Sequence, residues 1–177
     1  MPEKAELARF EQVVLPHLGA AYNLARWIIG NDHDAEDVVQ ESCIRALKFF
    51  GGFRGENSRP WLLTIVRNTC FTWLRQNRVS ELSIELDEEI HGRGRGPGNP
   101  ESILLAAAQS EVVLKAIEEL PLEFREVIIL REMEDLSYKE IADVASIPVG
   151  TVMSRLARAR SRLQERLSGL IPAGVGA

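Results

Sequence analysis

Residues 137–158, SYKEIADVASIPVGTVMSRLAR, contain the pattern that decides the fold. Ser137 and Glu140 have the spacing of a capping box, in which a hydroxyl and a carboxylate satisfy the free N–H groups at a helix start. Pro148 then interrupts the helical pattern, and a second helix of about 18 residues is expected to begin near Val149. A short helix, a tight turn and a longer helix, with the small residue Ala142 at their crossing, predict a helix-turn-helix.

The longer helix is expected to have an apolar side and a basic flank. Its apolar residues recur every three or four positions and form one stripe. They are Val152, Leu156, Ala159, Leu163 and Leu167. The flank pointing away from them carries Thr151, Ser154, Arg155 and Arg158. Five arginines against one acid in residues 155–166 favour phosphate and guanine contacts in a major groove, the alternative being an ordinary solvated basic face.

The turn between these helices departs from the usual pattern. Ala145-Ser146 stands where a glycine or asparagine commonly adopts the left-handed conformation. A side chain with a Cβ there costs on the order of 1 kcal/mol. We therefore expect a slightly different crossing angle of the two helices.

Composition and charge bound the rest of the chain. The 177 residues are 45% hydrophobic, enough for one or two small domains, and the net charge of −5 argues against a uniformly basic surface. Seven acids against two bases lie in residues 79–111, around a glycine- and proline-rich run at 91–100 that predicts a flexible linker. The alternating residues 82–86 would form a lone strand without a partner, so they are assigned to this linker. We predict an all-α fold with helical domains at 1–78 and 101–168, a linker at 79–100 and a tail at 169–177.

The first domain is expected to begin with two helices. An apolar stripe, Val14, Leu18, Ala21, Ala25 and Ile28, forms the first, which Pro16 kinks or restarts and Gly30-Asn31 ends. Asp34 is expected to cap the second. Its predicted core face carries Val39, Cys43, Ala46, Leu47 and Phe50. The opposite face mixes Val38 and Ile44 with charged residues, which favours a docking surface over an ordinary solvated face.

A third helix is expected to be basic and aromatic. Ser58 is placed to cap it and Pro60 to lie in its first turn. Residues 45–78 contain seven bases and one acid, Glu56. Six aromatic residues lie in the same stretch, namely Phe49, Phe50, Phe53, Trp61, Phe71 and Trp73. Cations with interleaved rings favour binding of single-stranded nucleic acid, and the alternative is that the rings pack the core of the bundle.

Three segments, in this order, resemble those of bacterial extracytoplasmic-function (ECF) RNA polymerase sigma factors, of the sigma-70 superfamily. Residues 34–41, DAEDVVQE, resemble the helix that grips the coiled coil of the polymerase beta-prime subunit. Residues 61–68, WLLTIVRN, resemble the start of the helix that contacts the minus-ten element. Residues 137–142, SYKEIA, followed by 147–156, IPVGTVMSRL, are similar to the reader of the minus-thirty-five element. The resemblance covers nearly the whole chain.

The resemblance implies a sigma factor that binds core RNA polymerase, through its beta-prime and beta subunits, and directs promoter recognition and melting. It also implies an anti-sigma factor as a partner. The implied polymerase-binding residues are Asp37, Val38, Gln40, Glu41, Ile44 and Arg45. The implied minus-ten residues are Arg54, Glu56, Asn57, Ser58, Arg59, Trp61, Thr64, Arg67, Asn68, Phe71 and Arg75. The implied minus-thirty-five residues are Lys139, Gly150, Thr151, Ser154, Arg155 and Arg158. Thr72 stands where many relatives carry an acid, which leaves the promoter preference open.

Other functions stay open as alternatives. A sigma mimic would sequester an anti-sigma factor without touching DNA, and it predicts eroded basic faces. A stand-alone helix-turn-helix regulator would bind its operator without polymerase. An enzyme is disfavoured because the three histidines are scattered and neither a catalytic triad nor a phosphate-binding glycine loop appears. Asp32-His33-Asp34 is more simply a helix boundary than a metal site, and no cofactor is expected.

The chain is also expected to be cytoplasmic and to have no membrane insertion. Cys43 and Cys70 are far apart and form no CxxC pattern, so neither a disulfide framework nor a zinc ribbon is expected, and a reducing cytosol fits. The N-terminus carries acids and no apolar signal region, and no stretch reaches the roughly 18 apolar residues of a membrane span.

Overall fold

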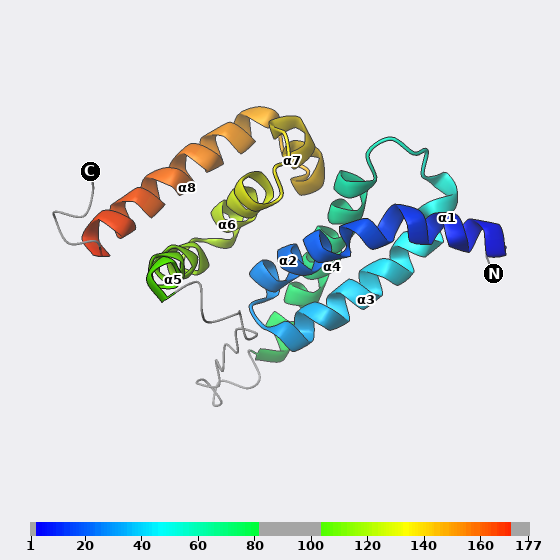
Figure 1. Cartoon of the computed structure of the whole chain (residues 1–177), viewed down its shortest axis with the longest axis horizontal. Helices are drawn as coiled ribbons and strands as arrows, with labels where there is room; N and C mark the ends of the chain where they lie inside the picture. Colours follow the sequence, from blue (N-terminus) through cyan, green and yellow to red (C-terminus); the bar gives the residue numbers. More distant parts are fainter. Residues whose placement is uncertain (1–2, 82–103, 171–177) are drawn as a thin grey trace.

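The regular structure of this protein is helical throughout the residues that the structure describes. The computed structural model describes residues 3–81 and 104–170. Two groups of helices lie side by side, and the first and last described helices extend to opposite ends of the molecule (Figure 1). The predicted all-α class is confirmed. Residues 79–81 of the predicted linker are helical, because the last helix before it continues to Glu81. Residues 82–100, with the possible strand at 82–86 and the predicted cap Asn99 with Pro100, fall outside the described residues.

The first group contains the helices before the linker. They are α1 (Lys4–Val14), the 3₁₀ turn η1 (Leu15–His17), α2 (Leu18–Ile29), α3 (Asp32–Phe49), the 3₁₀ turn η2 (Phe50–Gly52) and α4 (Ser58–Glu81). Pro16 lies in η1, so it restarts the helix as predicted. Gly30 ends α2 with φ of 99°, a left-handed conformation that glycine adopts without a Cβ penalty. Pro60 lies in the first turn of α4, as expected.

Helix α3 differs from its prediction at its start and in its buried face. Asn31, not Asp34, is the N-cap, and its side-chain oxygen accepts a bond from the backbone N–H of Asp34 at 2.9 Å. The fully buried residues are Ala35, Val38, Ser42 and Ala46, whereas Val39, Cys43 and Leu47 are half-buried. The buried face is therefore rotated toward Ser42. A serine can enter this core because its hydroxyl donates to the backbone oxygen of Val38 at 2.7 Å, which hydrophobic periodicity does not register.

The second group contains the helix-turn-helix and its scaffold. Its elements are α5 (Leu104–Glu118), α6 (Leu122–Ile128), the π-helical turn η3 (Ile129–Met133), α7 (Tyr138–Ala145) and α8 (Val149–Leu170). In η3 the backbone N–H of Glu134 donates to the oxygen of Ile129 at 3.1 Å, across five residues. Residues 127–130 are buried, which confirms them as scaffold. Helix α8 has 22 residues and is longer than predicted.

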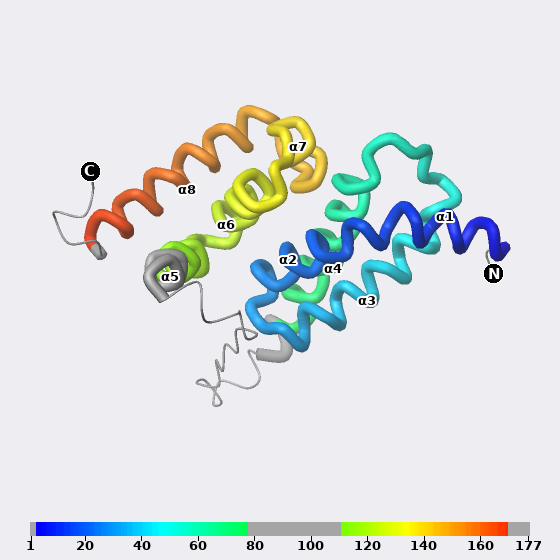
Figure 2. Tube along the Cα trace, viewed as in Figure 1, coloured from blue at the N-terminus to red at the C-terminus, as the bar shows by residue number. Residues whose placement is uncertain are grey.

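The two groups pack against each other. Helix α2 contacts α6, and α4 contacts α7 (Figure 2). One continuous apolar cluster joins both groups and includes Leu63 and Val66 of α4 as well as Val127 and Ile141 of the second group. The sequence did not indicate how the two domains sit relative to each other, because residues far apart along the chain make this contact.

Candidate nucleic-acid interface

The outer face of α3 presents most of the residues expected to dock on polymerase. Asp37, Gln40 and Glu41 are exposed, and Ile44 is 60% exposed. Arg45 is half-buried and donates to Glu41 Oε1 at 2.7 Å, one turn away. Val38 is 2% exposed, so its placement on this face was wrong. It belongs to the core because α2 and α4 both pack on α3 and cover a wider arc than a single neighbour would.

An aromatic cluster holds the loop before α4. Phe50 is buried, with ring centroids 5.4 Å from Phe10 and 6.0 Å from Phe53. Phe53 in turn lies 4.5 Å from Trp61, at the start of α4. These rings anchor both ends of the loop in the core, so the core interpretation holds for Phe50, while Phe49 is 64% exposed.

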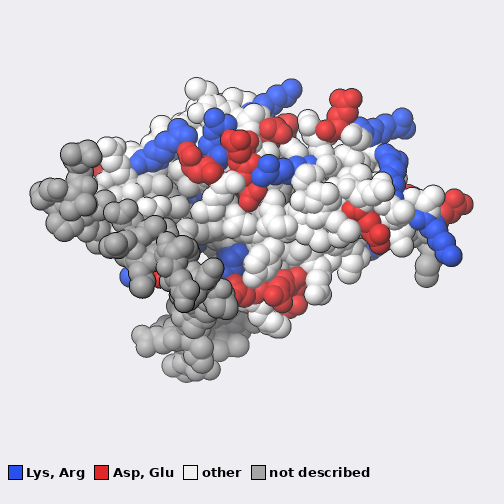
Figure 3. Space-filling view, viewed as in Figure 1, with Lys and Arg blue, Asp and Glu red and all other residues white. Residues whose placement is uncertain are grey.

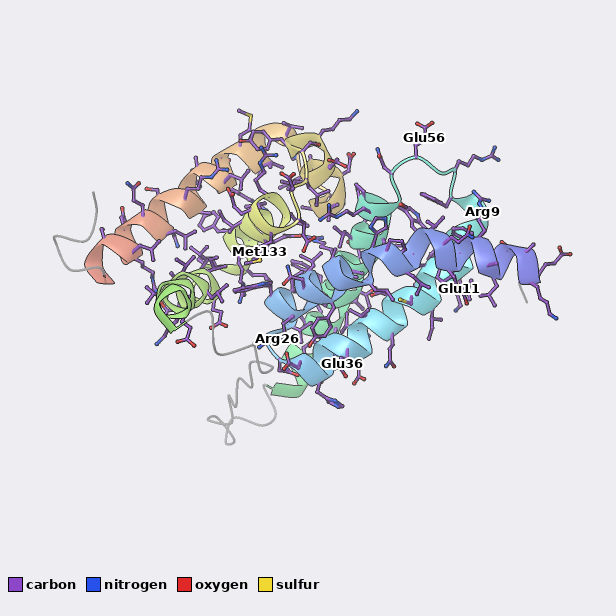
Figure 4. The ribbon with its side chains drawn as sticks, viewed as in Figure 1. Arg9, Glu11, Arg26, Glu36, Glu56 and Met133 are labelled. Carbon is purple, nitrogen blue, oxygen red and sulfur yellow. The ribbon has the colours of Figure 1, made fainter. Side chains whose placement is uncertain are left out.

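The loop itself is presented to solvent. Arg54, Glu56 and Asn57 are exposed, and Glu56 points away from the protein at the tip of the loop (Figure 4). Behind the loop, His17 Nε2 and Ser58 Oγ lie 3.0 Å apart. Burial, and then the positive charge of Arg59, lower the pKa of His17, which favours its neutral form.

Helix α4 brings several predicted minus-ten residues onto one surface. The guanidinium of Arg67 lies over the ring of Phe71, 3.8 Å from its centroid. Asn68 and Arg75 are exposed beside this pair. Thr64 instead donates to the backbone oxygen of Pro60 at 2.8 Å, which keeps its hydroxyl on its own helix. The structure therefore groups residues 67, 68, 71 and 75.

The helix-turn-helix forms as predicted. Ser137 Oγ accepts from the backbone N–H of Glu140 at 3.1 Å, and Glu140 Oε1 accepts from the N–H of Ser137 at 2.9 Å, which completes the capping box. Ser146 adopts the left-handed conformation at the turn, with φ of 56°. A serine here keeps the geometry that glycine usually provides, at a cost of about 1 kcal/mol.

The outer flank of α8 faces away from its buried stripe. Val152, Leu156 and Ala159 are buried, whereas Ser154 and Arg158 are exposed. The remaining predicted residues are Lys139 and Gly150, which are exposed, and Thr151 and Arg155, which are half-buried. This arrangement suits entry of the first turns of α8 into a major groove.

The comparisons with known proteins match both groups of helices. Residues 13–79 match the family model for Sigma-70 region 2, and residues 110–163 match that for Sigma-70 region 4. The ECF RNA polymerase sigma-E factor of Salmonella typhi is 39% identical over 145 residues, which are 78% of this chain and 76% of that protein. This chain belongs to the ECF RNA polymerase sigma factors. It directs promoter recognition and transcription initiation.

Further proteins are similar to this chain in sequence or structure. The SigE factor of Mycolicibacterium smegmatis is 32% identical over 168 residues, 94% of this chain and 64% of that protein. The solved structure of the sigma factor RpoE of Bartonella quintana, in complex with the anti-sigma factor NepR, has a TM-score of 0.72 at 30% identity and covers 90% of this chain and 97% of that chain. CnrH, in complex with the cytosolic domain of CnrY, has a TM-score of 0.61 at 26% identity and covers 92% of this chain and 90% of that chain.

In this ECF sigma factor, two arginines of the predicted minus-ten set are already bound to acids. Arg67 Nε donates to Glu126 Oε1 at 2.6 Å, and Arg59 Nη2 donates to Glu134 Oε2 at 2.6 Å. The sequence prediction missed both acids. The available signal was weak: Glu126 directly precedes the apolar run at 127–130, and nothing in the sequence names its partner.

Met153 is a further residue that the sequence prediction missed. Its side chain is 54% exposed at the start of α8, between the predicted contact residues Thr151 and Ser154. An apolar side chain at this place fits contact with a thymine methyl group in the major groove. Its signal in the sequence was its position off the apolar stripe of this helix.

The described residues of this ECF sigma factor show neither a metal site nor a membrane helix. Asp32 pairs with Arg26, and Asn31 Nδ2 donates to Asp34 at 2.7 Å, so both acids serve the start of α3. In residues 3–81 and 104–170, no three His, Cys, Asp or Glu side chains are grouped so that they would hold a metal ion. None of the helices described there combines the length and the hydropathy that a membrane crossing requires.

Proposed function

We propose that the two domains of this sigma factor divide promoter recognition between an opened strand and a closed duplex. The observation that carries this proposal is that one chain presents the Arg67–Phe71 pair on α4 and the exposed Arg158 on the capped helix-turn-helix. A cation with an aromatic face suits an unstacked strand, and an arginine near the start of a recognition helix suits base edges. We also propose that the first domain ends at residue 78 and that the second begins at residue 101.

The first domain docks on core polymerase through the outer face of α3. We assign Asp37, Gln40, Glu41, Ile44 and Arg45 to this contact, with the beta-prime subunit as the partner. Ile44 supplies exposed apolar area, and the surrounding charges give the orientation. Val38 is not included, because its side chain is buried.

The loop before α4 captures an extruded base of the minus-ten element. Its exposed side chains are those of Arg54, Glu56 and Asn57, with Ser58 and Trp61 at its base. The strand that follows runs along Arg59, Thr64, Arg67, Asn68, Phe71 and Arg75 of α4. Extruding a base costs about a few kcal/mol, which a fitting pocket offsets for a matching base and not for others. Melting thereby becomes dependent on sequence.

The second domain contacts the minus-thirty-five element as duplex. Thr151, Ser154, Arg155 and Arg158 face the base edges, while Lys139 and the backbone near Gly150 contact phosphates. Backbone contacts fix the register, and base contacts supply the specificity. The chain performs no catalysis of its own and works in the cytoplasm, where polymerase and the chromosome lie.

An anti-sigma factor is a further partner in this proposal. Two similar chains are bound to a partner in their solved structures. RpoE is bound to the anti-sigma factor NepR, and CnrH is bound to the cytosolic domain of CnrY. We propose that a protein of this kind regulates the present chain as well.

The acidic segment at 79–100 is proposed to lie in a basic channel of the polymerase, and exchanging its acids for neutral residues should weaken initiation.

Run-off transcription tests the proposal. Purified core polymerase, a genomic promoter library and the full chain should give new start sites that share two spaced sequence blocks. Arg155→Ala with Arg158→Ala, or Arg67→Ala with Arg75→Ala, should abolish them. Promoter-directed synthesis that survives both double substitutions overturns the assignment. Binding of a promoter without polymerase would support a stand-alone regulator, and binding of an anti-sigma factor without any transcription would support a sigma mimic.

A further inference from the structure

The loop between η2 and α4 is held at both ends, while its tip stands clear of the protein. At its first end, the backbone N–H of Phe53 donates to the oxygen of Phe50 at 3.0 Å. The ring centroid of Phe53 also lies 4.5 Å from that of Trp61 in α4. At the tip, Gly55 has φ of 49°, and a Cβ there would meet no atom of the described residues within 4 Å, its chain neighbours aside. The position of the tip is therefore set by what holds the two ends.

His17 holds the second end from a distant part of the chain. Pro16 restarts the helix in η1, and this turn presents the His17 ring to the start of α4, where Nε2 lies 3.0 Å from Ser58 Oγ. The two residues are 41 positions apart in the sequence. The backbone N–H of Trp61 donates to the oxygen of Asn57 at 3.2 Å, which puts the cap of α4 at Asn57 instead of the predicted Ser58. The Ser58 hydroxyl is thus engaged by His17 at the point where the loop becomes a helix.

The contact between His17 and Ser58 is directional because the ring is neutral. Burial, and then the positive charge of Arg59, lower the pKa of His17. A neutral imidazole has one N–H donor and one acceptor nitrogen, and a hydroxyl can donate and accept at once. In either tautomer of the ring, Ser58 therefore bonds to Nε2 and keeps a hydrogen-bonding group for a nucleotide.

Charge alone does not select a base at this loop. On the described part of the face shown in Figure 3, basic and acidic side chains are interspersed, so a strand would meet both signs of charge there. Attraction of phosphates is also the same for every base. Base selection then depends on hydrogen-bonding groups that are held in place, because a group that moves freely also adapts to the wrong base.

Holding the hydroxyl of Ser58 has a defined effect on the loop. A serine side chain has about three staggered positions, and a partner that bonds to the hydroxyl in one of them selects that position. The bond to His17 therefore orients the Ser58 hydroxyl and ties the first turn of α4 to η1. Both effects reach the loop, since Asn57 directly precedes Ser58.

We infer that His17 is a positioning residue for promoter recognition: through Ser58 it fixes the loop at which a base of the minus-ten element is selected. The inference rests on the proposed role of this loop in base capture. It extends the minus-ten site beyond residues 54–75, in which every residue of the predicted set lies. The turn between α1 and α2 thereby helps to set which promoters this sigma factor opens.

His17→Asn and His17→Gln form the main pair of variants. The glutamine amide extends about as far as Nε2 of histidine, whereas the asparagine amide extends only about as far as Nδ1. Glutamine therefore keeps the bond to Ser58, and asparagine loses it. Run-off transcription with core polymerase and the full chain is measured on promoters that carry each base in turn at every minus-ten position. The preference for the best base over the worst should fall about three- to tenfold in His17→Asn, the worth of one hydrogen bond, and about twofold at most in His17→Gln.

Two controls separate positioning from stability. His33→Asn makes the same substitution at a histidine whose side chain is 85% exposed, and it should leave the base preference unchanged. A loss of folded protein would lower synthesis from all promoters alike, so the midpoint of thermal unfolding and the total synthesis are recorded with each preference. Ser58→Ala should reduce the preference as His17→Asn does, and the double variant should show no further loss, because both substitutions remove one contact.

The possible failures have separate meanings. A natural base preference in His17→Asn, with a changed preference in Ser58→Ala, would overturn the positioning role and leave base capture by the loop in place. Equal losses in His17→Asn and His17→Gln would make His17 a packing residue and would also overturn the positioning role. An unchanged preference after replacement of residues 54–57 by glycine and serine would instead refute the proposed capture of a base by this loop.

Discussion

Arg67 and Phe71, one helical turn apart on α4, form a stacked pair with 3.8 Å between the guanidinium carbon and the ring centroid. We expect Phe71→Leu to reduce run-off transcription about tenfold, because stacking of a base on an aromatic side chain is worth about 1–3 kcal/mol. Leucine keeps an apolar side chain there, and the midpoint of thermal unfolding checks that the fold persists. A template melted in advance should restore much of the lost synthesis. Full activity of Phe71→Leu on duplex promoters would remove Phe71 from strand capture.

Ile44 and Val38 lie on the same helix but should behave differently. Ile44 is 60% exposed, so Ile44→Ala should weaken binding to core polymerase by at least about fivefold with little change in stability. Val38 is 2% exposed, so Val38→Ala should lower the free energy of unfolding by about 1–2 kcal/mol. Titration with labelled polymerase and denaturant unfolding separate the two effects. Normal polymerase affinity of Ile44→Ala would contradict the docking assignment.

The capping box should stabilise the helix-turn-helix measurably. Ser137→Ala removes the acceptor for the backbone N–H of Glu140 and should cost about 1 kcal/mol. Ser161→Ala is the matched control, since Ser161 is exposed within α8, and its effect should stay within about 0.5 kcal/mol. Thermal unfolding of both variants gives the comparison. Equal midpoints for the two variants would mean that the box adds no stability.

Arg158 should contribute one contact to duplex DNA. Arg158→Ala is expected to weaken binding by about 1–3 kcal/mol and to relax the sequence preference at one base position. Arg160→Ala is a suitable control because Arg160 already donates to Glu132 at 2.9 Å. Binding of the polymerase complex to promoter duplexes that differ at single base pairs distinguishes the two variants. An unchanged affinity and sequence preference for Arg158→Ala would place that side chain outside the interface.

The buried thiol of Cys70 should make the folded protein less stable at alkaline pH. Burial, and then the charge of Glu126, raise the pKa of its thiol from 9.0 to about 12. The unfolded chain therefore loses this proton first, and the stability that Cys70 contributes is present below pH 9.0 and declines as the pH rises toward about 12. Denaturant unfolding at pH 7 and pH 10 should show a smaller decline for Cys70→Ala than for the natural chain. Equal declines would show that the thiol titrates normally.

Local signals in the sequence predicted the elements but not their docking. Ser137 with Glu140, Gly30 and Pro16 each act within one turn of the backbone, and their structural roles were predictable for that reason. The prediction of the buried face of α3 was less accurate. The Ser42 hydroxyl donates to a backbone oxygen of its own helix, so this residue enters the core as an apolar residue would. Contacts between domains were beyond prediction, since Arg67 and Glu126 are 59 residues apart along the chain and no local pattern links them.

The π-helical turn η3 determines the orientation of Glu134. Its five-residue bond from Glu134 to Ile129 accommodates one more residue than an α-helical turn would. An α-helical turn over the same residues would bond Met133, in place of Glu134, to Ile129, and would rotate the Glu134 carboxylate by about 100°, the angle between neighbours on a helix. Arg59 and Asn23, which both donate to Glu134, would then lose their shared acceptor, so this wide turn aims the second domain's acid at the first domain.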